Sequence, residues 1–107
     1  MPKQSRLGDC VKISCPHGTQ IGIIASASKT TYVDSLGCAR ITDTVVCTTC
    51  GQSGQIISGS QFSFADTKNK AKIGDYEIGT CNPGLCKQCP HTHNGKIIQG
   101  SDYTYTT

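Results

Sequence analysis

The chain has 107 residues, with eight Cys, three His, twelve Gly, no Trp and a net charge of +3. This length corresponds to one domain, 1–107, whose thin core would need a metal, disulfides or a partner for stability. The small charge and the scattered Lys and Arg argue against a nucleic-acid partner. The low apolar content and the frequent Gly, Ser and Thr favour short strands and tight turns over long helices.

We expect neither a membrane-spanning helix nor a Sec signal in this sequence. No apolar run reaches the roughly 18 residues that a membrane-spanning helix needs. The first nine residues contain no apolar segment of the kind found in Sec signal peptides, so we expect synthesis in a reducing cytoplasm. In such a compartment, a set of Cys and His residues is more often a metal site than a disulfide framework.

One short unit occurs three times along the chain. Each copy contains a basic residue, an Asp three positions later, a Cys/His loop, Gly with paired Ile, a Ser, and alternating aromatic or β-branched residues. The basic residue and the Asp of the three copies are Arg6 and Asp9, Arg40 and Asp43, and Lys72 and Asp75. Because an acid that recurs once per copy is typical of a structural pair, we expect each Asp to bind the basic residue or a turn of its own copy.

The repeat predicts the fold class. Copies of about 30 residues cannot each hold a core, so the three must share one. Alternation of aromatic and polar residues at Phe62, Phe64, Tyr103 and Tyr105 is the period of half-buried strands, and we expect these aromatics in the core. We therefore predict an all-β fold of short hairpins, with the three copies arranged around a pseudo-three-fold axis.

Counting from the paired isoleucines aligns one possible metal ligand in each copy. His17, Cys50 and His91 lie six residues before Ile23, Ile56 and Ile97, respectively. A pseudo-three-fold axis would bring these positions together. His93 can supply a fourth ligand, because alternate residues of an extended segment can be turned to the same side. Three His and one Cys would form a closed tetrahedral site, which is how structural zinc is held.

Other metal sites remain open. Cys47-x-x-Cys50 and Cys86-x-x-Cys89 together have the spacing of a zinc-ribbon ligand set, which would indicate a binding module for nucleic acid or protein. His-x-His can bind iron octahedrally in trimeric proteins, but one chain already supplies the repeats here, so we favour zinc. A redox Cys-x-x-Cys would need a helix N-terminus, and a catalytic zinc would need an open position with a general acid or base beside it.

The remaining cysteines have no assigned state. Cys38 is expected to be a small buried residue. The others could be free, form disulfides or hold a second metal. They are Cys10, Cys15, Cys47, Cys81, Cys86 and Cys89.

The repeated motifs resemble the PAAR-repeat proteins, the tips of type VI secretion systems, contractile phage tails and related particles. The resemblance covers the chain from about Arg6 to Tyr105. It is carried by Arg6-Leu7-Gly8-Asp9, Cys38-Ala39-Arg40-Ile41-Thr42-Asp43, Ala71-Lys72-Ile73-Gly74-Asp75, Ile57-Ser58-Gly59-Ser60 and Ile98-Gln99-Gly100-Ser101.

The resemblance implies a small cone with a metal near the apex and a triangular base on a trimeric β-helical spike. Family members bind zinc through three His and one Cys, a set that His17, Cys50, His91 and His93 match. The implied function is that of a membrane-piercing tip, with no enzymatic activity. The implied partners are one spike trimer per tip and the target membrane. The chain would be a monomer on its own, made in the bacterial cytoplasm and active at the tip of the particle.

Overall fold

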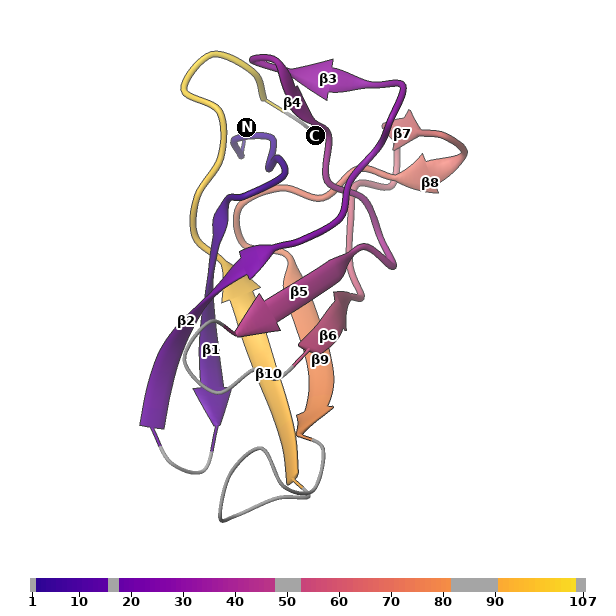
Figure 1. Ribbon diagram of the computed structural model, residues 1–107. Helices are drawn as coiled ribbons and strands as arrows, with labels where there is room; N and C mark the ends of the chain where they lie inside the picture. The colour runs from indigo at the N-terminus through magenta and orange to yellow at the C-terminus, as the bar shows by residue number, and fades with distance from the viewer. Residues whose placement is uncertain (1, 16–17, 48–52, 82–90, 106–107) are drawn as a thin grey trace.

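The computed structural model describes residues 2–15, 18–47, 53–81 and 91–105. Within these ranges every regular element is a β-strand, which confirms the predicted all-β class (Figure 1). The strands are β1 (Cys10–Cys15), β2 (Gly18–Ile24), β3 (Tyr32–Val33), β4 (Leu36–Gly37), β5 (Thr44–Cys47), β6 (Ser53–Ile56), β7 (Phe64–Ala65), β8 (Lys68–Asn69), β9 (Tyr76–Cys81) and β10 (His91–Ile97).

Six of the strands close into a barrel. Their order around it is β1-β10-β9-β6-β5-β2, and every neighbouring pair is antiparallel. The barrel therefore consists of three hairpins, β1/β2, β5/β6 and β9/β10, one from each copy of the repeat. The pairs β3/β4 and β7/β8 form two small separate sheets toward the opposite end from the hairpin turns (Figure 1). The molecule is elongated, with extents of 40 × 23 × 21 Å.

Backbone hydrogen bonds demonstrate the pseudo-three-fold axis directly. Ser5, Ala39 and Ala71 form a closed ring in which each residue donates to the carbonyl of the preceding copy. The N–H of Ser5 donates to Ala71 at 3.2 Å, that of Ala39 to Ser5 at 3.0 Å, and that of Ala71 to Ala39 at 2.9 Å. All three residues are fully buried. We call these residues the axial ring. A cyclic arrangement of this kind requires three equivalent segments around one axis.

The turn that enters each hairpin repeats the same symmetry. The N–H groups of Gly8, Thr42 and Gly74 donate to the carbonyls of Ile24, Ile56 and Ile97 at 2.9, 2.8 and 2.9 Å. All three donors have positive φ, namely 89°, 74° and 94°. Glycine reaches this conformation without steric cost, whereas the β-branched Thr42 is strained there. The second copy therefore departs from the motif at a position that favours glycine.

These bonds correct the register expected for the first copy. Ile24, not Ile23, is equivalent to Ile56 and Ile97, so the sequence alignment of that copy was wrong by one residue. Burial explains the true register, because Ile24 points into the barrel while Ile23 is 37% exposed. The residue six positions before Ile24 is Gly18, and His17 immediately precedes it.

The barrel core follows the repeat, except that the third copy has a charged residue type at one buried position. Ile24, Ile56 and Ile97 are buried together as one layer. Val11 and Val45 occupy the second position after the repeated Asp, where the third copy has Glu77. Cys38 is fully buried, as expected, and packs with Val33 and Ala65 in a second small cluster.

Three arms extend from the end of the molecule opposite the hairpin turns. Two are the β3/β4 and β7/β8 pairs, in which Tyr32 pairs with Gly37 and Phe64 with Asn69. The third arm is built from both ends of the chain, where Lys3 bridges to Tyr105. The two ends of the chain therefore form the arm that completes the pseudo-three-fold arrangement. We call the three arms together the base.

The expectation of core aromatics was wrong. Phe62, Phe64, Tyr103 and Tyr105 are 78%, 55%, 85% and 48% exposed. Phe64 lies in a strand and Tyr105 in a β-bridge, whereas Phe62 and Tyr103 lie in bends. The arm strands bury one face, with Val33 and Ala65 in the small cluster, and leave the aromatic side chains on the outside.

Candidate metal centre and docking base

All three hairpins of the barrel close at the same end. Neighbouring strands are antiparallel, so the ends at which β1, β5 and β9 finish and β2, β6 and β10 begin point away from the base (Figure 1). The strand residues that flank these turns are Cys15 and Gly18, Cys47 and Ser53, and Cys81 and His91. We call this region the hairpin end. Three chain segments that are far apart in sequence therefore meet there.

The predicted ligands belong to these three hairpins. His17 and Cys50 lie outside the described residues, between strand ends that reach the hairpin end. The backbones of His91 and His93 are in β10, paired with Cys81 and Gly79. No group of three or more possible ligands occurs within 2–15, 18–47, 53–81 and 91–105. The topology thus brings together the segments that carry all four predicted ligands, and the ligand set itself stays a prediction.

A layer of three glycines lies on the inner face of the barrel. A Cβ on Gly22 would come within 2.7 Å of the Ile13 side chain, and one on Gly95 would come within 2.7 Å of the Glu77 carboxylate. A Cβ on Gly54 would also clash with that carboxylate and would lie 2.6 Å from the carbonyl of Ile78. The interior is therefore filled at this level, and each hairpin needs glycine there.

Glu77 is the functional residue that sequence reasoning missed. Its side chain is fully buried in the barrel, and burial raises its pKa from 4.5 to about 7. The signal was present in the repeat, because Val11 and Val45 occupy the equivalent positions. A carboxyl group at a position that is otherwise apolar carries a desolvation cost and holds its proton to near-neutral pH.

The alternative four-cysteine site would need Cys47. That residue is fully buried in the core cluster, and its Sγ lies 2.7 Å from Oε1 of Gln20. The inward position of Cys47 is explained by core packing, because it follows Val45 on the buried face of β5.

The repeated acids form the structural pairs predicted for them. Arg6 lies 3.0 Å from Asp9, Arg40 lies 2.8 Å from Asp43, and Lys72 lies 3.2 Å from Asp75. Each carboxylate also accepts the backbone N–H of its basic partner, at 2.7, 2.7 and 2.8 Å. The hydrogen bond to the carboxylate raises the pKa of each Arg further above its ordinary value. These buried acids therefore fix the start of each hairpin.

The two arginines also tie the arms of the base together. Arg6 binds Asp34 of the first arm at 3.0 Å, and Arg40 binds Asp66 of the second at 2.9 Å. Asp34 accepts a hydrogen bond from Ser101, and Asp66 accepts hydrogen bonds from Ser28 and Thr30. The bonds from Ser28 and Thr30, together with Arg40, lower the pKa of Asp66. The first and second arms are thus each bound to the preceding copy in the cyclic order.

Comparison with known proteins identifies the family. A family model described as the PAAR motif matches residues 10–77, more than half of the chain. The chain belongs to the PAAR motif family. The match begins at β1 and ends in β9, while the repeated hydrogen bonds continue through the third copy to Thr104. A search of curated proteins finds no match.

Family membership gives the general role of the fold. PAAR proteins are structural spike tips of secretion and phage machines. Among the residues that the structure describes, no helix is long and apolar enough to cross a membrane.

Proposed function

We propose that this protein caps and sharpens the trimeric central spike of a contractile injection machine, in a phage tail or a type VI secretion system. It would act mechanically, as a non-enzymatic tip that starts puncture of the target membrane. The observation that carries the proposal is the pseudo-three-fold base. One asymmetric chain that presents three equivalent faces can match a three-fold partner with a single copy.

Exposed aromatic side chains supply the docking chemistry. Tyr32, Phe64 and Tyr105 occupy equivalent positions on the three arms and are 60%, 55% and 48% exposed. Aromatic residues are enriched at protein interfaces, where they bury a large area at low entropic cost. Among the described residues β3 and β7 each pair with one strand, so a partner could cover their other edge. The base therefore fits a flat three-fold surface such as the end of a spike trimer.

A structural zinc ion at the hairpin end would hold the three hairpins together. The proposed ligands His17, Cys50, His91 and His93 provide three nitrogen donors and one sulfur donor, a set that suits tetrahedral zinc. The structure supports this fit because all three ligand-bearing hairpins close at one end of the barrel. Bound zinc would supply a cross-link between segments that have little room for an apolar core.

The test is the composition of the complex with a trimeric spike protein from a contractile particle. The mass of the complex, measured by light scattering, should correspond to one copy of this chain on each trimer. A triple Ala variant of Tyr32, Phe64 and Tyr105 should bind at least about tenfold more weakly. The matched control is Tyr76→Ala, an exposed aromatic on the barrel wall. Three copies per trimer, or no binding, would contradict the proposal.

A further inference from the structure

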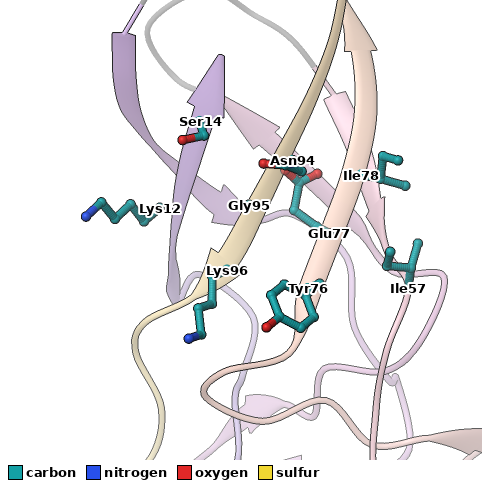
Figure 2. A pocket seen from close by; sticks show the side chains of 9 residues that line it. All are labelled: Lys12, Ser14, Ile57, Tyr76, Glu77, Ile78, Asn94, Gly95 and Lys96. Carbon is teal, nitrogen blue, oxygen red and sulfur yellow. The ribbon is translucent and has the colours of Figure 1, made fainter.

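A groove of about 430 Å³ runs along the outer wall of the barrel, over β1, β10 and β9 (Figure 2). It lies on the barrel and includes none of the aromatic residues of the base arms. Basic side chains from β1 and β10 and apolar ones from β9 and the residue after β6 line it, together with the polar Ser14 and Asn94. The basic residues are Lys12 and Lys96, and the apolar ones are Ile57, Tyr76 and Ile78.

The two lysines are direct neighbours across the strands. Lys12 and Lys96 are register partners in the β1–β10 pair, where like charges repel. Neither forms an ion pair with an acid among the described residues, and both are exposed. Lys96 Nζ lies 6.0 Å from the centre of the Tyr76 ring. The strand pair thus presents two uncompensated positive charges at one edge of the groove.

Apart from Ser14 and Asn94, the remaining exposed side chains of the groove are apolar. Ile57, Tyr76 and Ile78 are 53%, 53% and 48% exposed, although they lie beside one another on β9 and the segment that bonds to it. The one acid of the lining, Glu77, is fully buried because it alternates with Tyr76 and Ile78 and faces the barrel interior. The exposed surface therefore combines positive charge with hydrocarbon and contains no exposed acid.

The other two copies lack this combination. At the positions equivalent to Lys12 they have Val46 and Ile78, and at the positions equivalent to Lys96 they have Ile23 and Gln55. Symmetry of the fold therefore does not require a lysine pair. Because the pair breaks the repeat and opposes strand pairing, it is better explained by a ligand that neutralises it.

We propose that this groove binds an anionic phospholipid. The phosphate would lie between Lys12 and Lys96, and an acyl chain would cover Ile57, Tyr76 and Ile78. Charge complementarity selects a negative headgroup, and the adjacent exposed apolar side chains select a lipid over a free anion. The inference extends the proposed function, since puncture would bring this wall of the barrel against lipid.

Vesicle flotation tests the proposal on the full chain. Vesicles of phosphatidylcholine with phosphatidylglycerol should bind the protein, and pure phosphatidylcholine vesicles should not. The double variant Lys12→Gln/Lys96→Gln should bind about 30-fold more weakly, from about 1 kcal/mol for each lysine near an anionic surface. Ile78→Ser should also weaken binding without changing charge. Lys12→Gln/Lys96→Gln should melt at or above the wild-type temperature, and Ile78→Ser should remain folded at the assay temperature, which separates lost binding from lost folding.

The matched control is Lys29→Gln/Lys68→Gln, which removes two exposed lysines from the base arms. It should retain wild-type flotation. Equal losses in the two double variants would overturn the proposal in favour of general charge attraction. Absence of binding to anionic vesicles, or complete displacement by inorganic phosphate, would overturn it as well. The composition of the spike complex should be the same for Lys12→Gln/Lys96→Gln as for the wild type, so a failure here is distinguishable from a failure of the proposed tip function.

Discussion

The base and the hairpin end obey the three-fold repeat to different degrees. At the end of the barrel that adjoins the base, the same hydrogen bonds recur in all three copies, from the axial ring to the turns at Gly8, Thr42 and Gly74. At the hairpin end, the links between paired strands differ in length, running from Cys15 to Gly18, from Cys47 to Ser53 and from Cys81 to His91. The two ends therefore need different means of holding three segments together.

The difference teaches how a small repeat protein distributes its stability. Backbone bonds and buried ion pairs depend on few side-chain identities, so the base tolerates Lys for Arg and Ser for Ala. At the hairpin end the three links between strands differ in length, so they do not offer three equivalent segments for a repeated set of backbone bonds. Side chains cannot replace those bonds from inside, because the barrel interior is already filled at the level of Gly22, Gly54 and Gly95. A shared metal ion would join the three turns without requiring equal lengths.

Removal of the proposed zinc should have the largest effect and should act on one end only. Chelation should lower stability by an amount on the order of 10 kcal/mol at most, the scale of structural zinc sites. Hydrogen exchange should then accelerate first at Ser14 and Thr19, near the hairpin end, before it reaches Ser5, Ala39 and Ala71. Simultaneous exchange at both ends would show that the two regions are not held separately.

Loss of a basic residue should weaken the base, and the copies should differ. Arg40→Ala should destabilise by about 3 kcal/mol, because it leaves the buried Asp43 without its charged partner. Lys72→Ala should cost less, since Lys72 pairs with Asp75 alone among the described residues while Arg40 also binds Asp66. Urea unfolding measures both. Lys72→Arg is the control and should keep or raise stability. An equal loss of unfolding free energy in Arg40→Ala and Lys72→Ala would contradict the predicted difference between the two copies.

Glu77 should make stability depend on pH near neutrality. Its folded pKa of about 7 exceeds the ordinary 4.5, so the folded state holds the proton longer than the unfolded state. Stability should therefore be highest below pH 4.5, fall by up to about 3 kcal/mol as the pH rises to about 7, and level off above it. Glu77→Gln, which cannot ionise, should abolish this slope in thermal melts. An unchanged slope in that variant would assign the pH dependence to other groups.

Thr42→Gly should give a small gain. Thr42 has the positive φ that Gly8 and Gly74 adopt at equivalent turns, and relief of that strain should stabilise by about 1 kcal/mol. Gly74→Ala should lose a similar amount. The midpoint of urea unfolding should move in opposite directions for the two variants, and movement in the same direction would disprove the equivalence of the turns.

Much of the fold could be predicted because the repeat encodes it in local chemistry. The Arg6–Asp9 spacing predicts an ion pair within one turn, and the repeated Gly and Ile predict hairpins with a shared core. The register of the first copy could not be read from the dipeptide Ile23-Ile24, because burial of alternate residues, not sequence identity, determines which Ile faces inward.

The surface was harder to predict than the core. Alternation at Phe62 and Phe64 indicates an extended strand but not whether anything covers it. Glu77 could have been found by aligning it with Val11 and Val45. The Lys12–Lys96 pair depends on β1 pairing with β10, a contact between the two ends of the chain that no local pattern indicates.

Zinc content is the most direct test of the claim that one metal joins the three hairpins. Elemental analysis of the purified protein should find about one zinc per chain, as expected for one closed four-ligand site. His17→Ala, Cys50→Ser and His91→Ala, one change in each hairpin, should each lower the zinc content and the melting temperature. The control Cys86→Ser should change neither. Full zinc content in both His17→Ala and His91→Ala, with loss in Cys86→Ser, would contradict the shared site and favour ligation by cysteines alone.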